Sequence, residues 1–168
     1  LPPGVERHVV NAGGLTGLQI FPDDEIEIIN EEGNQICEII CFDKDGKSEL
    51  GILNQKENCK KSFIKELLKG KDESSLITNL QLKKRNLDIN KSKSSILFDE
   101  QTPSGEKIKI KSKDKCYVIF AAPQNNMLVS EQNPSSDLTL YIKRYKIIND
   151  KELSIIPDPI YEPNYEEN

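Results

Sequence analysis

The 168-residue chain contains no tryptophan, one methionine and one histidine. One histidine, His8, cannot build a metal site that needs several imidazole ligands, and we interpret it as structural or exposed because no carboxylate is expected to orient it. The apolar runs are only a few residues long, far short of the roughly 20 residues that a transmembrane helix needs. No cationic segment followed by an apolar one marks a secretory signal. The sequence therefore argues against a membrane partner.

Cysteine is also sparse, with four residues at positions 37, 41, 59 and 116. Small secreted domains that depend on disulfides are richer in cysteine, so we expect reduced thiols and a cytoplasmic location. The spacing of Cys37 and Cys41 does not match the spacing of zinc-binding cysteine pairs, and both are expected in the core as small apolar side chains. Cys59 stands at the start of a predicted helix, where the helix dipole would lower a thiol pKa; a reactive thiol stays open as the minor alternative there.

The charge of the chain is mildly acidic: 23 basic and 28 acidic residues give a formal net charge of −5. A nucleic-acid-binding domain usually carries a positive patch or a positive net charge. The balance therefore argues against nucleic acid as a partner.

Alternating and continuous apolar patterns predict most of the chain to be β-strand. Glu25–Asn30 and Gln35–Phe42 are predicted to form a hairpin around the turn at 31–34, and residues 1–17 an N-terminal arm. Further strands are expected at 96–98, 107–111, 116–122 and 137–145. The continuously apolar Cys116–Ala122 is expected to be the most buried strand.

Helix signals are confined to Asn58–Lys69, where apolar residues at positions 63, 64, 67 and 68 form one stripe. Asn58 is the expected N-cap and Gly70 the expected end. Residues 71–95 are expected to hold short elements joined by loops. Asp43-Lys44-Asp45-Gly46 predicts a turn rather than a calcium loop, because Lys47 stands where a ligand is required.

Strands before and after a single helical segment favour an α+β fold of mainly antiparallel β-structure, barrel-like or sandwich-like, with one or two short helices. We expect residues 1–156 to form this domain. Residues 157–168 are rich in proline and acidic residues, which predicts a tail or linker.

Two positions are candidates for a binding site, although the sequence carries no phosphate-binding loop and no nucleophile motif. Glu38 stands mid-strand near Gln35, where a carboxylate is costly to bury unless it is paired. It either faces an edge of the sheet or lines a pocket. The amides Gln124, Asn125 and Asn126 follow the most buried strand, and polar loops at strand ends are common pocket sites. A plain connection is the alternative there.

The segment Gly33-Asn34-Gln35, with the acid Glu38 three residues after Gln35, resembles the urea carboxylase-associated domain family. Members of that family carry Asp at the acidic position, whereas this chain has Glu.

Motifs in the second half resemble the N-terminal domain of long aminomethyltransferase-like proteins. In those proteins urea carboxylase-associated domains precede a glycine-cleavage T-protein domain. The motifs are, in order, Phe98, Pro103-Ser104-Gly105, Ala121-Ala122-Pro123, Met127, Gln132, Pro134-Ser135-Ser136-Asp137-Leu138, Lys143-Arg144 and Pro157-Asp158-Pro159.

This resemblance implies an accessory domain with no catalytic residue and no metal of its own. Its partner would be a downstream T-protein-like domain or subunit, and tetrahydrofolate would belong to that associated domain. A small methylated amine or amino acid would contact Gln35, Glu38, Gln124, Asn125 and Asn126.

Two alternatives stay open. The first is a non-catalytic protein-interaction module, which predicts an exposed apolar patch. The second is a small metal-dependent amidine or urea hydrolase-like domain, which requires a bound metal.

Overall fold

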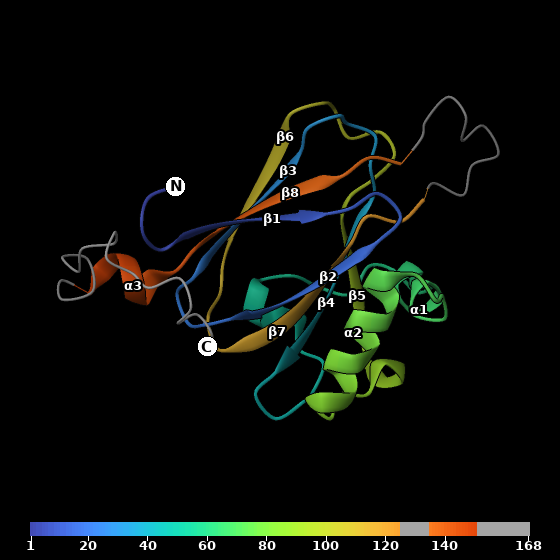
Figure 1. The fold of residues 1–168 in the computed structure, drawn as a ribbon, viewed down its shortest axis with the longest axis horizontal. Coiled ribbons are helices and arrows are strands. Elements are labelled where there is room, and N and C mark those ends of the chain that lie inside the picture. Colours follow the sequence, from blue (N-terminus) through green and yellow to red (C-terminus); the bar gives the residue numbers. More distant parts are fainter. Residues whose placement is uncertain (125–134, 151–168) are drawn as a thin grey trace.

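The structure is a computed structural model that describes residues 1–124 and 135–150. Its described part contains eight strands in two four-stranded antiparallel sheets (Figure 1). The first sheet has the order β1 (Val5–Val10), β8 (Leu138–Lys143), β3 (Glu25–Asn30), β6 (Glu106–Lys111). The second has the order β2 (Leu15–Ile20), β7 (Cys116–Ala121), β4 (Cys37–Asp43), β5 (Ser94–Phe98).

The main core lies between the two sheets and takes apolar side chains from all eight strands. β3 contributes Ile26 and Ile28, while its alternate residues are only half buried. All six residues of β7 are buried, as the continuous apolar run predicts. The α+β fold of mainly antiparallel β-structure is therefore confirmed, as a sandwich whose sheets do not close into a barrel.

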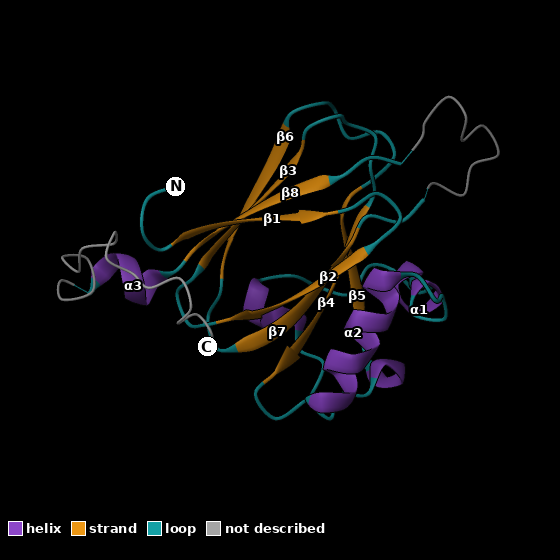
Figure 2. Ribbon diagram, in the orientation of Figure 1, coloured by secondary structure: helices purple, strands orange, loops and turns teal. Residues whose placement is uncertain are grey.

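The helices form a third layer on the outer face of the second sheet (Figure 2). They are α1 (Phe63–Leu67) and α2 (Glu73–Lys84), with a short 3₁₀ turn at Ile89–Lys91. Another 3₁₀ turn, Leu50–Leu53, packs its side chains into the main core instead. Ile64 and Leu82 pack with Phe42 and Ile119 of the sheet in a second apolar cluster. A separate helix, α3 (Tyr145–Asn149), follows β8 at the opposite end of the molecule.

The predicted hairpin of β3 and β4 is wrong, because the two strands belong to different sheets. The connection follows the loop at 102–105 instead: Asn34 N donates to Thr102 O at 2.7 Å. Gly33 and Asn34 have φ of 81° and 59°, and positive φ at two consecutive residues is also what a type I′ hairpin turn requires. The turn chemistry was therefore identified, but not the change of sheet that it produces.

Three other expectations also fail. Residues 1–17 form β1 and the start of β2 rather than an arm. Asn58 does not cap a helix; its side chain pairs with Ile96 of β5 in both directions, at 2.6 and 3.2 Å, and Ser62 is the N-cap of the shorter helix α1. The 12-residue helix α2 occupies a segment expected to hold short elements joined by loops. The expected domain boundary at residue 156 lies outside the described residues.

Candidate functional site

Gln35 lies just before β4 and is 2% exposed. Its amide donates to Pro123 O at 2.8 Å and to Ile36 O at 2.9 Å, and its Oε1 accepts from Ser136 N at 2.8 Å. The side chain therefore ties the chain after β7 to the chain before β8. These hydrogen bonds position the two segments relative to each other and engage the amide group of Gln35.

Glu38 lies in β4 with no exposed surface, so its carboxylate does not face a sheet edge. Oε1 accepts from the backbone N–H groups of Phe63 and Ile64 at 2.8 and 3.1 Å, and Oε2 accepts from Ser62 Oγ at 2.6 Å. The carboxylate thus satisfies N–H groups that the first turn of α1 leaves without helical partners. It anchors α1 to the second sheet.

Gln124 is the one member of the predicted site that lies exposed beside an open cavity in the described part. The cavity, of about 710 Å³, lies between the turn at 11–17 and the first turns of α2, with Ile77 on its wall. A side chain on Gly14 would come within 3.1 Å of Ser74 Oγ, so the turn approaches α2 closely because Gly14 has none. Asn125 and Asn126 lie outside the described residues.

A second polar cavity, of about 360 Å³, lies near the start of β8 and is lined by Glu31, Glu32, Asp137 and Arg7, among others. Two of these three acids already have partners: Thr139 Oγ1 donates to Glu31 at 2.8 Å and Ala12 N donates to Asp137 at 2.8 Å. These bonds hold β8 against the β3–β4 connection and the β1–β2 turn, so we assign them to the fold.

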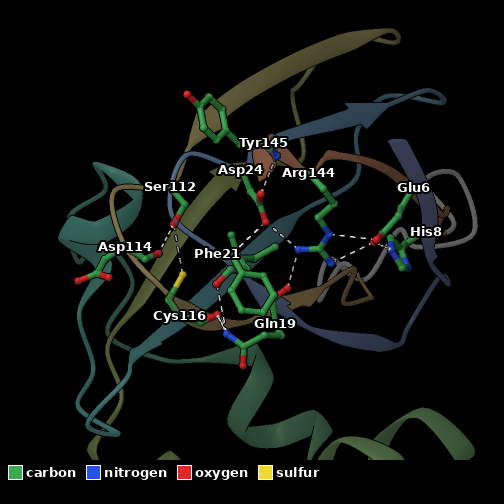
Figure 3. A network of polar contacts seen from close by, with 11 residues as sticks. Glu6, His8, Gln19, Phe21, Asp24, Ser112, Asp114, Cys116, Arg144 and Tyr145 are labelled. Atoms are coloured by element: carbon green, nitrogen blue, oxygen red, sulfur yellow. Dashed lines mark hydrogen bonds and ion pairs between the residues drawn. The ribbon is translucent and has the colours of Figure 1, made fainter. Parts of the chain in front are cut away.

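A further polar network is centred on Arg144, directly after β8 (Figure 3). Its Nε and Nη2 donate to both carboxylate oxygens of Glu6 at 3.0 Å, and Nη1 donates to Asp24 Oδ2 and to Gln19 O at 2.8 Å. Asp24 is 1% exposed and also accepts from Tyr145 N at 2.9 Å. The network joins β1, the β2–β3 turn and the start of α3.

Pairing in this network changes the acidity of its members. Burial alone would raise the pKa of Glu6, but hydrogen bonds from Arg144 and His8, with their positive charge, bring it below its ordinary value. Burial alone would lower the pKa of Arg144, yet its bonds to Glu6 and Asp24 raise it. The network is therefore an ionic clasp that holds three segments together.

Sequence reasoning missed this clasp. His8 does have a carboxylate neighbour, because its Nε2 lies 3.0 Å from Glu6 Oε1. Residues two apart on a strand share a face, so the pair was visible in the sequence once residues 5–10 are assigned as a strand. The contact of Arg144 with Asp24, 120 residues away, had no such signal.

Three of the four cysteines lie in the core of the described structure, where a hydrogen bond with Cys41 lowers the pKa of the buried Cys116 thiol. Cys37, Cys41 and Cys116 are buried and free, as expected. Burial, and then the charge of Glu38, raises the pKa of Cys59, whose Sγ donates to Lys61 O at 3.2 Å. The pKa of Cys59 is thus raised and not lowered, and α1 begins only at Phe63, so Cys59 does not stand at the start of a helix.

Within residues 1–124 and 135–150, no three His, Cys, Asp or Glu side chains gather closely enough to hold a metal ion. No helix of this part is long and apolar enough to cross a membrane.

Comparison with known proteins finds a relative in sequence and a neighbour in structure. No protein-family model matches the chain. It is 32% identical over 163 residues to the trimethylamine-oxide aldolase of Ruegeria pomeroyi; the match covers 97% of this chain but only 20% of that protein's length. A DUF1989 family protein from Silicibacter pomeroyi aligns over 98% of this chain and 86% of its own, with a TM-score of 0.50 and 11% identity. The chain is thus similar to a fifth of a trimethylamine-oxide aldolase and has the fold of a DUF1989 family protein.

Proposed function

We propose that this chain is an accessory domain of an enzyme that acts on methylated amines, of the trimethylamine-oxide aldolase kind. The observation that carries the proposal is the sequence similarity to that aldolase along 97% of the chain. Similarity to only a fifth of the relative is what an accessory domain of a larger enzyme would give.

The use of the buried carboxylates supports an accessory role. Glu38 anchors α1, and Asp24 is held by Arg144 and by backbone N–H groups. Carboxylates in general acid–base or nucleophilic catalysis must be within reach of the reacting atoms. Both side chains are instead enclosed and bonded to the protein itself, which is a positioning role.

We further propose that the urea carboxylase-associated and T-protein resemblances describe the setting of this domain. In that setting a T-protein-like domain or subunit binds tetrahydrofolate and carries the group transfer, outside this chain. The aldolase relative supports the link to methylated amines, and the folate link rests on the sequence motifs.

Substrate contact is proposed for Gln124, together with Asn125 and Asn126 of the same segment. The cavity beside Gln124 offers an amide for an N-oxide or carboxylate oxygen and the apolar Ile77 for methyl groups. Gln35 and Glu38 then act indirectly, since Gln35 fixes the chain at Pro123 and Glu38 fixes the helical layer.

Isothermal titration tests this contact. The full chain should give saturable heat with trimethylamine oxide, or with dimethylglycine, sarcosine or betaine. Gln124→Ala should weaken that binding about tenfold, which corresponds to the loss of one hydrogen bond to a polar ligand. Gln101→Ala is a matched control, because Gln101 is exposed and does not line this cavity. Absence of heat with all four ligands would remove the proposed substrate contact.

A second candidate function is a protein-interaction module, because α2 exposes three large aliphatic side chains. Leu76, Ile77 and Leu80 are 55%, 52% and 62% exposed. Contiguous apolar surface of this kind often marks an interaction site.

A further inference from the structure

Helix α2 carries its apolar side chains on the outside. It buries Ser75, Thr78 and Leu82 against the second sheet and exposes Leu76, Ile77 and Leu80. Positions i, i+1 and i+4 lie on one face of a helix, so the three exposed side chains form one patch. A helix at a solvated surface normally has the opposite arrangement, with its apolar stripe toward the core. The patch therefore has the character of a contact surface.

The same face of α2 carries opposite charges at its two ends. At about 100° per residue, Glu73, Lys83 and Lys84 project on the side of the three aliphatic residues. All three charged residues are exposed. In the described part of the chain none of them forms an ion pair with another side chain. The face thus runs from an acid, through an apolar centre, to a pair of bases.

This pattern is complementary to itself under a two-fold rotation. If two α2 helices pack antiparallel about an axis that crosses the exposed face midway between Ile77 and Leu80, Glu73 lies opposite the partner's Lys84 and Ile77 lies opposite the partner's Leu80. Each contact then occurs twice, as in an isologous dimer interface. The helix dipoles also run in opposite directions, which is favourable. An unrelated partner gives no reason for the acid and the bases to flank the apolar centre at similar distances.

We infer that a second copy of this chain binds to the α2 face, defined by Glu73, Leu76, Ile77, Leu80, Lys83 and Lys84. The inference deepens the interaction-module candidate. Glu73 and Ile77 of this face also line the cavity beside Gln124, so a dimer and a bound methylated amine would share part of this surface. A chain that stays monomeric would leave the titration with methylated amines unaffected.

The size of the α2 face indicates how tightly the two copies should bind each other. A helix of 12 residues is about 18 Å long. A standard interface buries about 800 Å² on each partner, and this face is smaller. We expect a dimer that dissociates in the micromolar range or above, so that the oligomeric state depends on concentration.

Sedimentation velocity of the full chain from about 5 to 500 µM, a range chosen to span weak dissociation constants, measures this equilibrium. The sedimentation coefficient should rise with concentration toward that of a dimer. Leu80→Glu places a charge at the centre of the face and should weaken the dimer at least tenfold. Leu1→Glu, at an exposed leucine outside α2, should not change it. Circular dichroism melts confirm that each variant is folded.

Charge exchange tests the antiparallel geometry. Glu73→Lys alone and the double variant Lys83→Glu/Lys84→Glu should each dimerise more weakly than the parent, because like charges then meet at both ends. An equimolar mixture of the two variants should recover dimers, since each end again pairs a lysine with glutamate. A parent chain that is monomeric at the highest concentration overturns the inference, whether another segment or another protein covers the face. A dimer insensitive to Leu80→Glu, or a mixture no stronger than its components, overturns it equally.

Discussion

Buried carboxylates show how this chain uses charge. Glu38 and Asp24 are almost fully enclosed, and each accepts hydrogen bonds from more than one donor. Removing an ion from water costs several kcal/mol, and only such donors offset that cost. The two side chains therefore define the arrangement of the segments that supply their donors.

The sequence indicated that Glu38 needs a partner if it is buried, but not which partner. Its donors, Ser62, Phe63 and Ile64, lie 24 to 26 residues further along the chain. Neither local spacing nor charge pattern links them to β4. Contacts between distant segments also explain why the predicted site residues do not form one site in the structure. Gln35 and Glu38 are enclosed, whereas Gln124 faces a cavity.

The ionic clasp predicts a pH dependence at the residue scale. The pKa of Glu6 is lowered in the folded protein, so its pairing stabilises the fold above the ordinary carboxyl pKa of about 4.5 and is lost as the pH falls through the lower folded value. Urea unfolding between about pH 3 and pH 6 should show that the stability of Glu6→Gln depends less on pH than that of the parent.

Glu106→Gln is the control for that experiment, because Glu106 is an exposed acid with no ion pair among the described residues. Its pH profile should follow that of the parent. Parallel profiles for the parent and Glu6→Gln would show that the clasp does not contribute in this way.

Strands were the most predictable elements, because one buried face imposes a two-residue period. β3 and β6 show this directly, with isoleucines alternating with charged residues. In β3, Glu25 and Glu27 lie opposite Lys111 and Lys109 of β6. Strand pairing was harder to predict, because the β3–β4 connection has the residues of a hairpin turn yet leads into the other sheet.

Helix α2 was not predicted from the sequence, for a related reason. Its apolar residues are divided between two faces, with Leu82 buried and Leu76, Ile77 and Leu80 exposed. No single stripe of helical period results, although Asp72 is a good N-cap and its side chain accepts from Ser75 N. Because apolar residues lie on both faces of α2, the helix has a face available for contact but lacks the hydrophobic period from which a helix is predicted.

At the scale of elements, Glu38 should decide whether α1 stays docked. Glu38→Ala removes the acceptor of three hydrogen bonds and leaves N–H groups of α1 without partners, which should cost about 2–4 kcal/mol of unfolding free energy. Chemical denaturation measures this loss.

Glu66→Gln is the matched control, since Glu66 lies in α1 but pairs with Lys69 at an exposed site. It should change the unfolding free energy by less than about 0.5 kcal/mol. An equal effect of the two substitutions would refute the anchoring role of Glu38.

At the scale of the whole molecule, a sandwich of two antiparallel sheets presents three features outside its core: the clasp at Arg144, the cavity at Gln124 and the α2 face. The fold class followed from the strand patterns, whereas these features depend on contacts between distant segments. The match to a fifth of a trimethylamine-oxide aldolase gives this assembly its proposed setting.

Replacement of the corresponding region in the Ruegeria pomeroyi aldolase by this chain tests that setting most directly. The trimethylamine-oxide aldolase activity of the chimera should stay within about tenfold of that of the parent enzyme, a difference of no more than about 1.4 kcal/mol, whereas deletion of the region should abolish it. A folded chimera without activity, or a deletion variant with full activity, would contradict the accessory role.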